Sequence, residues 1–318
     1  MSSLSVSIVI PNFNGAHLLE KNLPRVVEAA KQYTKGKVDI IITDDHSTDN
    51  SLVFLEKFSK SEKAISITVV SNNNAQGFSC NVNSGVVYAK GDILLLLNTD
   101  AVPEANFILP LIEGFSDQNV FGVGCLEQTT DDSGHSKKYG RSFGSFTRGF
   151  IMHRTANPDE SDKTFWVSCG SGAFRKNIWD KLSGLDELFN PFYWEDVDLS
   201  YRAVKSGFIV RFEKRSVIHH YHNEGAIKEN FSPRTVTTKA YRNQIIFMWK
   251  NITDKQFLLE NILYLPYYIL KTLSVGDTNF ISGLFEAVFL LTKIKQSRFS
   301  AIKGFIFSDK EVLEKQRV

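Results

Sequence analysis

The chain has 318 residues, of which 42% are hydrophobic and 23% charged, a balance typical of a globular protein with a sizeable core. A formal net charge of +2 gives no strong positive field, so nucleic acid is not an expected partner. The three cysteines, Cys80, Cys125 and Cys169, are widely spaced, which argues against a disulfide framework or a zinc site and favours a reducing compartment.

The first hundred residues alternate between short β-branched apolar runs and segments in which apolar residues recur at helical spacing. Strands are expected over residues 6–10, 38–43, 65–71 and 93–97, and helices over residues 16–33, 49–59 and 78–89. This alternation predicts βαβ units, and therefore an α/β fold with a mostly parallel central sheet flanked by helices. The composition of the chain predicts neither a signal peptide nor a transmembrane helix.

Beyond Asp100 the alternation becomes less regular. Residues 129–162 are polar, so a long loop near a binding site is expected there. Helices are expected over residues 104–115, 177–182 and 195–206, and short strands over residues 209–212 and 216–218.

From about residue 235 the composition changes to apolar and aromatic helical segments with interspersed Lys and Arg. We therefore expect a first domain over residues 1–235 and a helical region over residues 236–318, with helices over 241–250, 257–273 and 279–294. Apolar faces with basic edges suit helices that lie on a membrane surface. A helical subdomain packed on the first domain explains the pattern equally well.

Polar residues follow each of the first four expected strands, and the carboxyl ends of parallel strands meet at one edge of a sheet. These residues are Pro11, Asn12 and Asn14; Asp44, Asp45 and Ser47; Asn72 to Asn74 and Gly77; and Asn98 and Asp100. Asn and Asp are common in turns and caps, so a single such end means little, whereas four together favour a polar ligand. Ser47 or Thr48 is expected to cap the next helix, which leaves Asp44 and Asp45 to accept hydrogen bonds from a base or a ribose.

Asn98 and Asp100 are two residues apart after the fourth strand, and alternate residues of an extended chain share a face. Their oxygens could hold a hard cation such as Mg²⁺ or Mn²⁺ between two phosphates, although a simple turn is the commoner use of this pattern. Further along, the small residues Gly172 and Ala173 permit close approach of the backbone to a ligand, or form a plain turn.

Three aromatic residues, ending at Trp194, lead into the acids Glu195, Asp196 and Asp198 at the start of an expected helix. Such acids often only stabilise the helix dipole, and Asp198 is spaced to pair with Arg202. An aromatic face beside a carboxylate also suits a sugar, and Asp196 or Glu195 could act as a general base. A later cluster of histidines, His219, His220 and His222, is compatible with either a structural or a metal-binding role.

Taken in chain order, these segments resemble the family 2 glycosyltransferases over roughly residues 5–225. The motifs are SIVIPNFNG, IITDDHSTDNS, NNNAQGFSCNVNSG, GDILLLLNTD, GSGAFRK and FYWEDVDLSYR followed by VIHHYH. The bacterial rhamnosyltransferase-like and galactofuranosyltransferase-like branches look closest. The resemblance implies a GT-A fold and an inverting, metal-dependent transferase that takes a UDP-, dTDP- or GDP-sugar and a glycan or lipid-linked acceptor. It implies a cytoplasmic location, compatible with the inner face of the cytoplasmic membrane.

The resemblance also implies roles for individual residues. The nucleotide pocket would be lined by Pro11, Asn12, Asn14, Asp45, Asn74, Gly77, Asn98 and Thr99, with Asp44 on the base. Asp100 and Asn98 would hold Mn²⁺ or Mg²⁺, completed by His219 or His220. Gly172 and Ala173 would lie against a sugar and Trp194 against the acceptor. Asp196, with Glu195 as the second candidate, would deprotonate the acceptor hydroxyl.

One departure from the family pattern concerns the metal site. The chain has Asn98-Thr99-Asp100 where an Asp-x-Asp motif is common, which removes one negative charge and predicts weaker metal binding.

Two alternatives remain open from the sequence. A nucleotidyltransferase would need a basic, glycine-rich phosphate loop near the N-terminus, which residues 11–15 do not form. A non-catalytic scaffold in a glycan-assembly complex would not need Asp44, Asp100, Asp196 and the histidine cluster, all of which are present.

Overall fold

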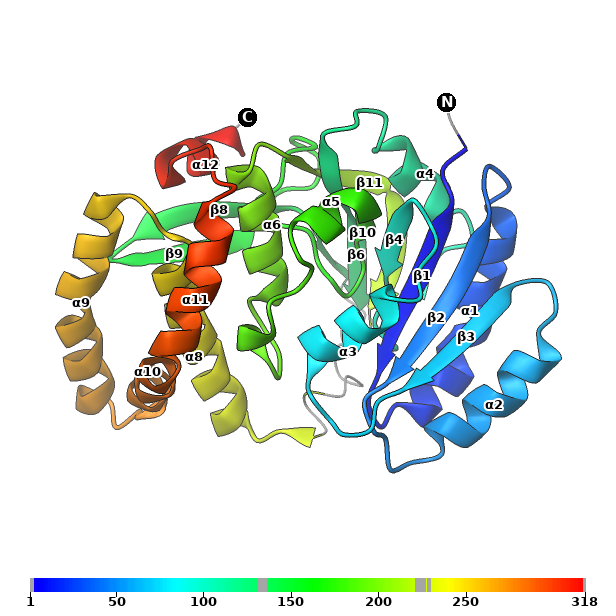
Figure 1. The fold of residues 1–318 in the computed structure, drawn as a ribbon, viewed down its shortest axis with the longest axis horizontal. Coiled ribbons are helices and arrows are strands. Elements are labelled where there is room, and N and C mark those ends of the chain that lie inside the picture. The colour runs from blue at the N-terminus through cyan, green and yellow to red at the C-terminus, as the bar shows by residue number, and fades with distance from the viewer. Residues whose placement is uncertain (1–2, 131–135, 221–226, 228–229, 317–318) are drawn as a thin grey trace.

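The computed structural model describes residues 3–130, 136–220, 227 and 230–316, and within them a nine-stranded sheet runs through the molecule (Figure 1). Four strands lie parallel in the order β3-β2-β1-β4: β1 (Val6–Asn12), β2 (Val38–Asp44), β3 (Ser66–Ser71) and β4 (Ile93–Leu96). The helices between them are α1 (Ala16–Gln32), α2 (Ser51–Ser61) and α3 (Phe78–Val86). The predicted βαβ alternation of this part is confirmed.

Both faces of these parallel strands are buried, because successive side chains point to opposite sides of the sheet. Val9 and Ile41 join a hydrophobic cluster on one face, together with Val82 of α3. Ile8 and Ile40 join the cluster on the other face, which includes α1. This two-sided burial explains why the strands are continuous apolar runs in the sequence.

Beyond β4 the sheet becomes mixed. β10 (Ala173–Arg175) lies antiparallel between β4 and β6 (Val120–Thr130), and β7 (Ser136–Tyr139) pairs with the end of β6. β11 (Ile209–His220) pairs parallel with β6 and antiparallel with β5 (Ala101–Pro103). The two short strands expected over 209–212 and 216–218 are thus one strand, with an irregular register between Glu213 and Val217.

The expectation of a long loop over residues 129–162 is wrong for most of that segment, although residues 131–135 lie outside the described part. β8 (Ser142–Thr147) and β9 (Phe150–Thr155) form an antiparallel hairpin. Its turn residues Arg148 and Gly149 have φ of 50° and 80°. A two-residue hairpin turn requires such positive values, which are rare for Arg, so the sequence carried no usual turn signal.

Two helix boundaries also differ from expectation. α4 (Ile108–Glu113) is shorter than residues 104–115, because the Glu104 N–H bonds to the Val217 carbonyl beside β5 and the helix starts only afterwards. The helix expected over 279–294 is two helices, α10 (Asn279–Phe289) and α11 (Leu291–Ile302). Leu290, at ψ 2°, turns the chain between them, and α11 then packs on α8 (Pro233–Asn251).

The remaining helices gather beside the mixed half of the sheet (Figure 1). They are α5 (Lys176–Lys181), the 3₁₀ helix η1 (Glu187–Phe189), α6 (Glu195–Lys205), α9 (Lys255–Ser274) and α12 (Asp309–Lys315). Phe247 of α8 and Phe280 of α10 belong to the same buried cluster as Phe174 of β10, so these helices pack directly on the sheet domain. Among the described residues, no helix has the length and apolar character needed to cross a bilayer.

Candidate active site

The loops after β1, β2 and β3 are tied together by the two aspartates of the second strand end. Asp44 is fully buried, and its carboxylate accepts hydrogen bonds from Asn12 Nδ2 and from the Ser47 N–H, both at 2.8 Å. The Asp45 carboxylate accepts from the Gly77 N–H at 2.8 Å. Both acids therefore organise backbone and amide groups at the edge of the sheet where the sequence predicts a nucleotide.

Asn14 and Ser47 connect the first two loops. The Asn14 N–H donates to Ser47 Oγ at 2.8 Å, and Asn14 Oδ1 accepts from the Thr48 N–H at 2.8 Å. Helix α2 begins at Ser51 with Asn50 before it, so the expected capping by Ser47 or Thr48 is wrong. These two side chains serve the loop contact instead.

The other residues expected at this edge fall into buried and exposed groups. Pro11 is a buried residue of β1, whereas Asn74 is exposed. Gly77 precedes α3 with φ 95°, and a Cβ there would lie 2.9 Å from Pro191 Cα, so only glycine fits between the loop and that proline. The Thr99 carbonyl accepts a hydrogen bond from Asn22 Nδ2 at 2.8 Å.

Asn98 sits against the small-residue segment that precedes β10. Its N–H donates to the Gly170 carbonyl at 2.8 Å, and a Cβ on Gly170 would lie 2.6 Å from Asn98 Nδ2. The Gly172 carbonyl accepts from the Leu96 N–H, and Ala173, the first residue of β10, has its side chain in the hydrophobic core. This segment thus brings its backbone close to the Asn98 side chain.

Asp100 and His220 meet where β5 pairs with the end of β11. Asp100 Oδ1 lies 3.0 Å from His220 Nε2, and both side chains are largely buried. His219, the preceding residue of the strand, points to the opposite face, where its Nε2 lies 3.4 Å from Glu104 Oε1. Of the two candidate histidines, His220 is therefore the one beside Asp100. His222 lies outside the described residues.

Glu127 of β6 joins this pair, and the sequence analysis missed it. Its Oε2 lies 3.5 Å from His220 Nδ1, and its Oε1 accepts a 2.5 Å hydrogen bond from Ser171 Oγ. Burial lowers the pKa of His220, but the bonds to Asp100 and Glu127 outweigh burial and raise that pKa to about 10. A lone Glu in a strand gives no signal in the sequence, because its place beside His220 is fixed only by the pairing of β6 with β11.

The turn before α6 is held in an unusual conformation by a residue of α8. Tyr193 and Trp194 both have positive φ, 73° and 74°. Asn243 Nδ2 donates to the carbonyls of Phe192 and Tyr193, both at 2.8 Å, which fixes this turn from the C-terminal side. Trp194 packs edge-on to His153 of β9, with ring centroids 5.4 Å apart. The C-terminal helices therefore position the first turn of α6.

Glu195 and Asp196 begin α6 without a cation partner among the described residues, Glu195 as a buried acid and Asp196 as a half-buried one. Burial, and then the charge of Asp196, raise the pKa of Glu195 well above its usual value, and Glu195 Oε2 has no hydrogen-bond partner in the described part of the chain. Burial raises the pKa of Asp196 to about 7, to which the charge of Glu127 contributes, although the N–H of Val197 lowers it. Perturbed acids of this kind are typical of catalytic sites.

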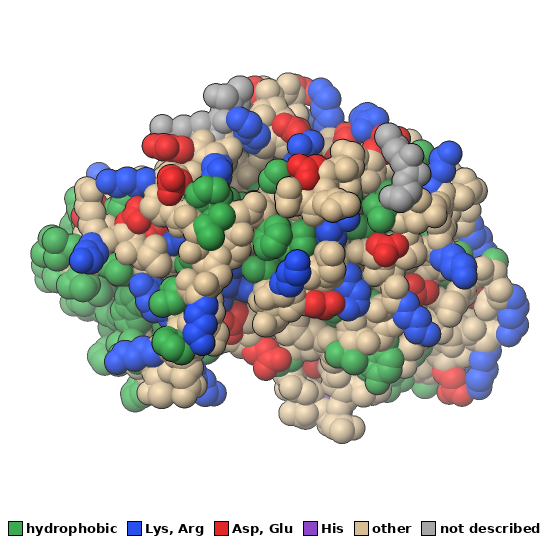
Figure 2. All heavy atoms as spheres, turned by 45° about the horizontal axis from the view of Figure 1, so that its top comes forward, with side chains coloured by type: hydrophobic (Ala, Val, Ile, Leu, Met, Phe, Trp, Pro, Cys, Tyr) green, Lys and Arg blue, Asp and Glu red, His purple; other side chains and the backbone are tan. Residues whose placement is uncertain are grey.

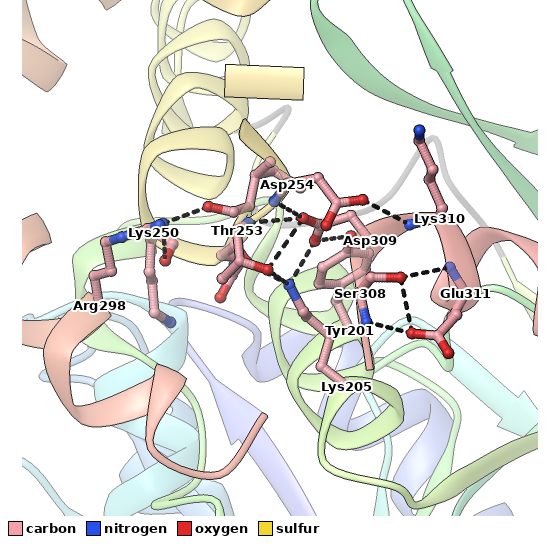
Figure 3. A network of polar contacts seen from close by, with 12 residues as sticks. Tyr201, Lys205, Lys250, Thr253, Asp254, Arg298, Ser308, Asp309, Lys310 and Glu311 are labelled. Atoms are coloured by element: carbon pink, nitrogen blue, oxygen red, sulfur yellow. Dashed lines mark hydrogen bonds and ion pairs between the residues drawn. The ribbon is translucent and has the colours of Figure 1, made fainter. Parts of the chain in front are cut away.

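Other buried acids nearby are fully paired. Asp198 accepts hydrogen bonds from Lys250, Asn251 and Arg202, which confirms the expected pairing of Asp198 with Arg202. Figure 3 shows a second network around Asp309, in which the carboxylate meets Lys205 Nζ at 2.6 Å and the Tyr201 hydroxyl at 2.7 Å. These contacts tie α6 to α8 and α12 and assign the paired acids a structural role.

A cavity of about 810 Å³ lies between α11 and the chain that leads from α5 into η1. Its lining includes Lys181, Glu187 and Lys303, and none of Asp100, Asp196 and His220. We place the candidate active site at the cluster of perturbed acids rather than at this cavity, because none of the residues of the cluster lines it.

The residues at the cluster fit a divalent metal ion in part. Carboxylate oxygen and imidazole nitrogen are suitable ligands for Mn²⁺, and two neighbouring ligands of an octahedral ion with bonds of about 2.1 Å lie about 3.0 Å apart. Asp100 Oδ1 and His220 Nε2 have that separation. Within the described residues no group of three His, Cys, Asp or Glu side chains is arranged to hold an ion, so further ligands would come from the donor or from amides such as Asn98.

Comparison with known proteins agrees with the fold. The family model of Glycosyl transferase family 2 matches residues 7–182. Chondroitin synthase of Pasteurella multocida is 24% identical over 280 residues, which cover 79% of this chain and 28% of that protein. O-antigen chain rhamnosyltransferase RfbN of Salmonella typhimurium is 23% identical over 224 residues, covering 69% of this chain and 67% of that one. The chain thus spans 28% of the length of the first relative and 67% of the second.

Solved structures resemble nearly the whole chain. The mannosyltransferase PcManGT from Pyrobaculum calidifontis, in complex with GDP-Man and Mn²⁺, has a TM-score of 0.57 at 14% identity and covers 94% of this chain and 85% of its own. Residues 1–349 of S. aureus TarS, in complex with UDP-GlcNAc, have a TM-score of 0.60 at 12% identity, covering 98% and 91%. At these identities the likeness is one of fold, and it confirms the predicted GT-A architecture.

Proposed function

This chain belongs to glycosyl transferase family 2, and we propose that it moves a sugar from a nucleotide-diphosphate donor to a hydroxyl of a glycan or lipid-linked acceptor, with inversion at the anomeric carbon. The observation that carries the proposal is the cluster of Asp100, His220 and Glu127 beside the unpaired acids Glu195 and Asp196. A donor phosphate and an acceptor hydroxyl each find suitable groups in this cluster.

The donor side is formed by the strand-end loops. Asp44 orients the Asn12 amide, whose Oδ1 is buried and has no hydrogen-bond partner within the described residues. Asp45 and Gly77 shape the neighbouring loop. The GDP-Man and UDP-GlcNAc of the similar structures support a nucleotide-sugar donor, and UDP-, dTDP- and GDP-sugars are the candidates for this chain.

Asp100 and His220, with Asn98 beside them, would hold Mn²⁺ or Mg²⁺ on the donor diphosphate. Bound there, the ion would supply Lewis-acid stabilisation of the leaving diphosphate. Mn²⁺ in the complex of PcManGT supports a divalent ion. His220 would have to lose its extra proton to bind a metal ion, so binding of the ion would release a proton.

Asp196 acts as the general base in this mechanism. It takes the proton from the acceptor hydroxyl, whose oxygen forms the new bond to the anomeric carbon as the bond to the diphosphate breaks. A pKa near neutral suits this role, because the carboxylate is present at pH 7 and is still basic. Burial raises the pKa of the neighbouring Glu195 well above its usual value, and Trp194 offers an aromatic face to the acceptor sugar.

The similar proteins support a class of acceptor. The names of the relatives, a chondroitin synthase and an O-antigen chain rhamnosyltransferase, support a role in building a surface polysaccharide. We place the reaction in the cytoplasm, at the inner face of the membrane when the acceptor is lipid-linked.

Thermal unfolding with a panel of nucleotides tests the proposal. A ligand that binds only the folded state adds about 2.7 kcal/mol of stability at a hundred times its Kd. We expect one of UDP, dTDP and GDP, with its sugar conjugates, to raise the melting temperature, and Mn²⁺ to enlarge the rise. Asp100→Asn should abolish the effect of Mn²⁺. If no nucleotide shifts the melting of the folded protein, the non-catalytic scaffold becomes the better account.

A further inference from the structure

An apolar surface on the C-terminal helices takes no part in the active site. Four residues of α9 and two of α10 are between 55% and 86% exposed, and we call them the α9–α10 face: Ile262, Leu263, Leu270, Leu273, Phe285 and Phe289. Figure 2 shows a continuous hydrophobic area at the left of the molecule, the side on which Figure 1 places α9, with Lys and Arg around it. Single exposed apolar residues are normal, but a contiguous patch of large ones marks an interaction site.

Helix α9 is apolar on both sides, and each side has a different neighbour. At 3.6 residues per turn, its four residues of the face lie within about 100° of the helix circumference. On the opposite side Phe257 stacks on Phe146 of β8, with ring centroids 3.8 Å apart. Asn261 Nδ2 donates to the Gly149 carbonyl in the hairpin turn at 2.8 Å. The inner side thus holds the β8–β9 hairpin, and the outer side is left to solvent.

Four lysines border the face, although α9 also carries Glu260 and the turn after it carries Asp277, both half-buried. Lys255 and Lys271 lie at the two ends of α9, and Lys293 and Lys295 follow α10. All four are exposed, and within the described residues none has a carboxylate at ion-pair distance. The acid of α10, Glu286, is paired inward with Lys239 at 2.7 Å.

We infer that the α9–α10 face docks on an anionic lipid surface. Apolar side chains flanked by unpaired lysines match the boundary between acyl chains and anionic headgroups. A second copy of the chain fits less well, because a two-fold contact would bring the same lysines against one another. The biological purpose of docking, which is to bring the enzyme to a lipid-linked acceptor, rests on the proposed function. The test of docking does not depend on that function.

The β8–β9 hairpin lies between the α9–α10 face and Trp194, the residue proposed to contact the acceptor. Helix α9 holds the β8–β9 hairpin, and His153 of β9 contacts Trp194, which precedes the proposed base. An acceptor whose lipid is anchored under α9 would therefore have its glycan close to Trp194. The arrangement gives the hairpin a role as the link between the lipid surface and the active site.

Co-sedimentation with vesicles tests the inference. We expect the full chain to sediment with vesicles of equal parts phosphatidylglycerol and phosphatidylcholine, and to bind pure phosphatidylcholine far more weakly. Replacing Leu263 and Phe289 together by Glu should weaken vesicle binding about tenfold or more, because two apolar side chains can no longer be buried in the lipid. Lys271→Gln should cost about fivefold. Val53→Glu, at a residue of α2 that is 53% exposed, is the matched control and should bind like the wild type.

Three results would overturn the inference: no binding of the folded wild type to anionic vesicles, equal binding by the Leu263→Glu, Phe289→Glu variant, or a wild-type dimer in sedimentation equilibrium that this variant dissociates. The last result would assign the face to a second copy. Release of nucleoside diphosphate from a soluble donor, measured in parallel, separates the two proposals. If the wild type releases nucleoside diphosphate but does not bind vesicles, docking alone is contradicted. If it binds vesicles but releases no nucleoside diphosphate, the transferase proposal alone is contradicted.

Discussion

Helix α6 carries acids in two contrasting environments. Asp198 accepts hydrogen bonds from Lys250 at 2.6 Å, Asn251 at 2.7 Å and Arg202 at 2.8 Å. Glu195, three residues earlier, has an Oε2 with no partner within the described residues, and Asp196 is held only by backbone N–H groups, such as that of Val197. Within one turn of the helix, Asp198 is paired with two cationic side chains, whereas Glu195 and Asp196 have no cationic partner among the described residues.

This difference separates structural from chemical roles. A buried carboxylate that meets cations and donors holds packed elements together, and removing a partner leaves an uncompensated charge. A buried carboxylate without a cation destabilises the fold, so its presence indicates another use. The comparison therefore predicts that substitutions at the paired acids and their partners change stability, whereas substitutions at the unpaired acids change chemistry.

The largest effect is expected for Asp196→Asn. The amide keeps the size of the side chain but cannot take a proton, so kcat should fall by about 10²- to 10⁴-fold. Nucleotide binding, measured by calorimetry, should not change. Asp180→Asn, at an exposed acid of α5 paired with Lys176, is the control and should keep its activity. Loss of nucleotide binding in Asp196→Asn would make Asp196 a donor-site or structural residue instead.

Lys205→Met should act on stability rather than on catalysis. The substitution leaves the buried Asp309 carboxylate without its cation and should lower the free energy of unfolding by about 3–5 kcal/mol, measured by urea denaturation. Lys60→Met breaks an exposed pair with Glu56 and should leave the urea midpoint nearly unchanged. Similar losses in the two variants would contradict the structural role of the Asp309 network.

Glu127→Gln should weaken metal binding. Partners that orient a metal-binding histidine typically change metal affinity by about 10- to 100-fold, and Glu127 faces Nδ1 of His220. Titration of Mn²⁺ followed by electron paramagnetic resonance measures the affinity directly. Glu104→Gln removes the neighbour of His219 and serves as the control. An effect of Glu104→Gln alone would point to His219 as the ligand.

Asp186→Asn should change how stability depends on acid. Burial raises the pKa of Asp186, but Lys250 outweighs it and lowers that pKa to about 2. Because the folded-state pKa lies below the usual value, the ion pair stabilises the fold above about pH 4, and this contribution is lost as the pH falls through about 2. The contribution of this ion pair to the free energy of unfolding is about 2 kcal/mol. Urea midpoints of the wild type should fall with pH in this window more steeply than those of Asp186→Asn, and parallel curves would contradict the assignment.

The pH dependence of kcat/KM should show an acid limb. Because the pKa of Asp196 is raised to about 7, protonation removes the base below that pH, and the rate should fall about tenfold per pH unit. Glu195→Gln should keep the limb, since Asp196 still supplies the titrating group. Glu127→Gln removes a charge that raises the pKa of Asp196, so it should move the limb to lower pH. A rate that stays flat to about pH 5 would exclude Asp196 as the base.

The fold was predictable from the sequence where strands are buried on both faces, because their hydrophobic pattern is then simple. The four parallel strands are buried on both faces, so each is a continuous apolar run that the sequence displays. β6 was missed because Gly122 and Gly124 interrupt its apolar pattern. The β8–β9 hairpin was missed because its turn uses Arg148, which takes a positive φ only in the tertiary context.

The candidate site was predictable in part for a related reason. Asp100, Asp196 and His220 follow strands or begin a helix, where a motif is visible in the chain, and the structure places each of them in or beside the cluster. Glu127 has no such position, because the register of β6 against β11 alone brings it to His220. Asp44 and Asp45, expected to face a ligand, mainly organise the loops, a role that depends on hydrogen bonds invisible in the sequence.

The most direct test is the release of nucleoside diphosphate from UDP-, dTDP- and GDP-sugars by the wild-type chain, with and without Mn²⁺. The account predicts metal-dependent release from the sugars of one nucleotide, faster when a glycan acceptor is supplied, and none from Asp196→Asn. A folded wild-type protein that binds the nucleotide yet releases no diphosphate from any donor, with or without acceptor, would contradict the proposed chemistry.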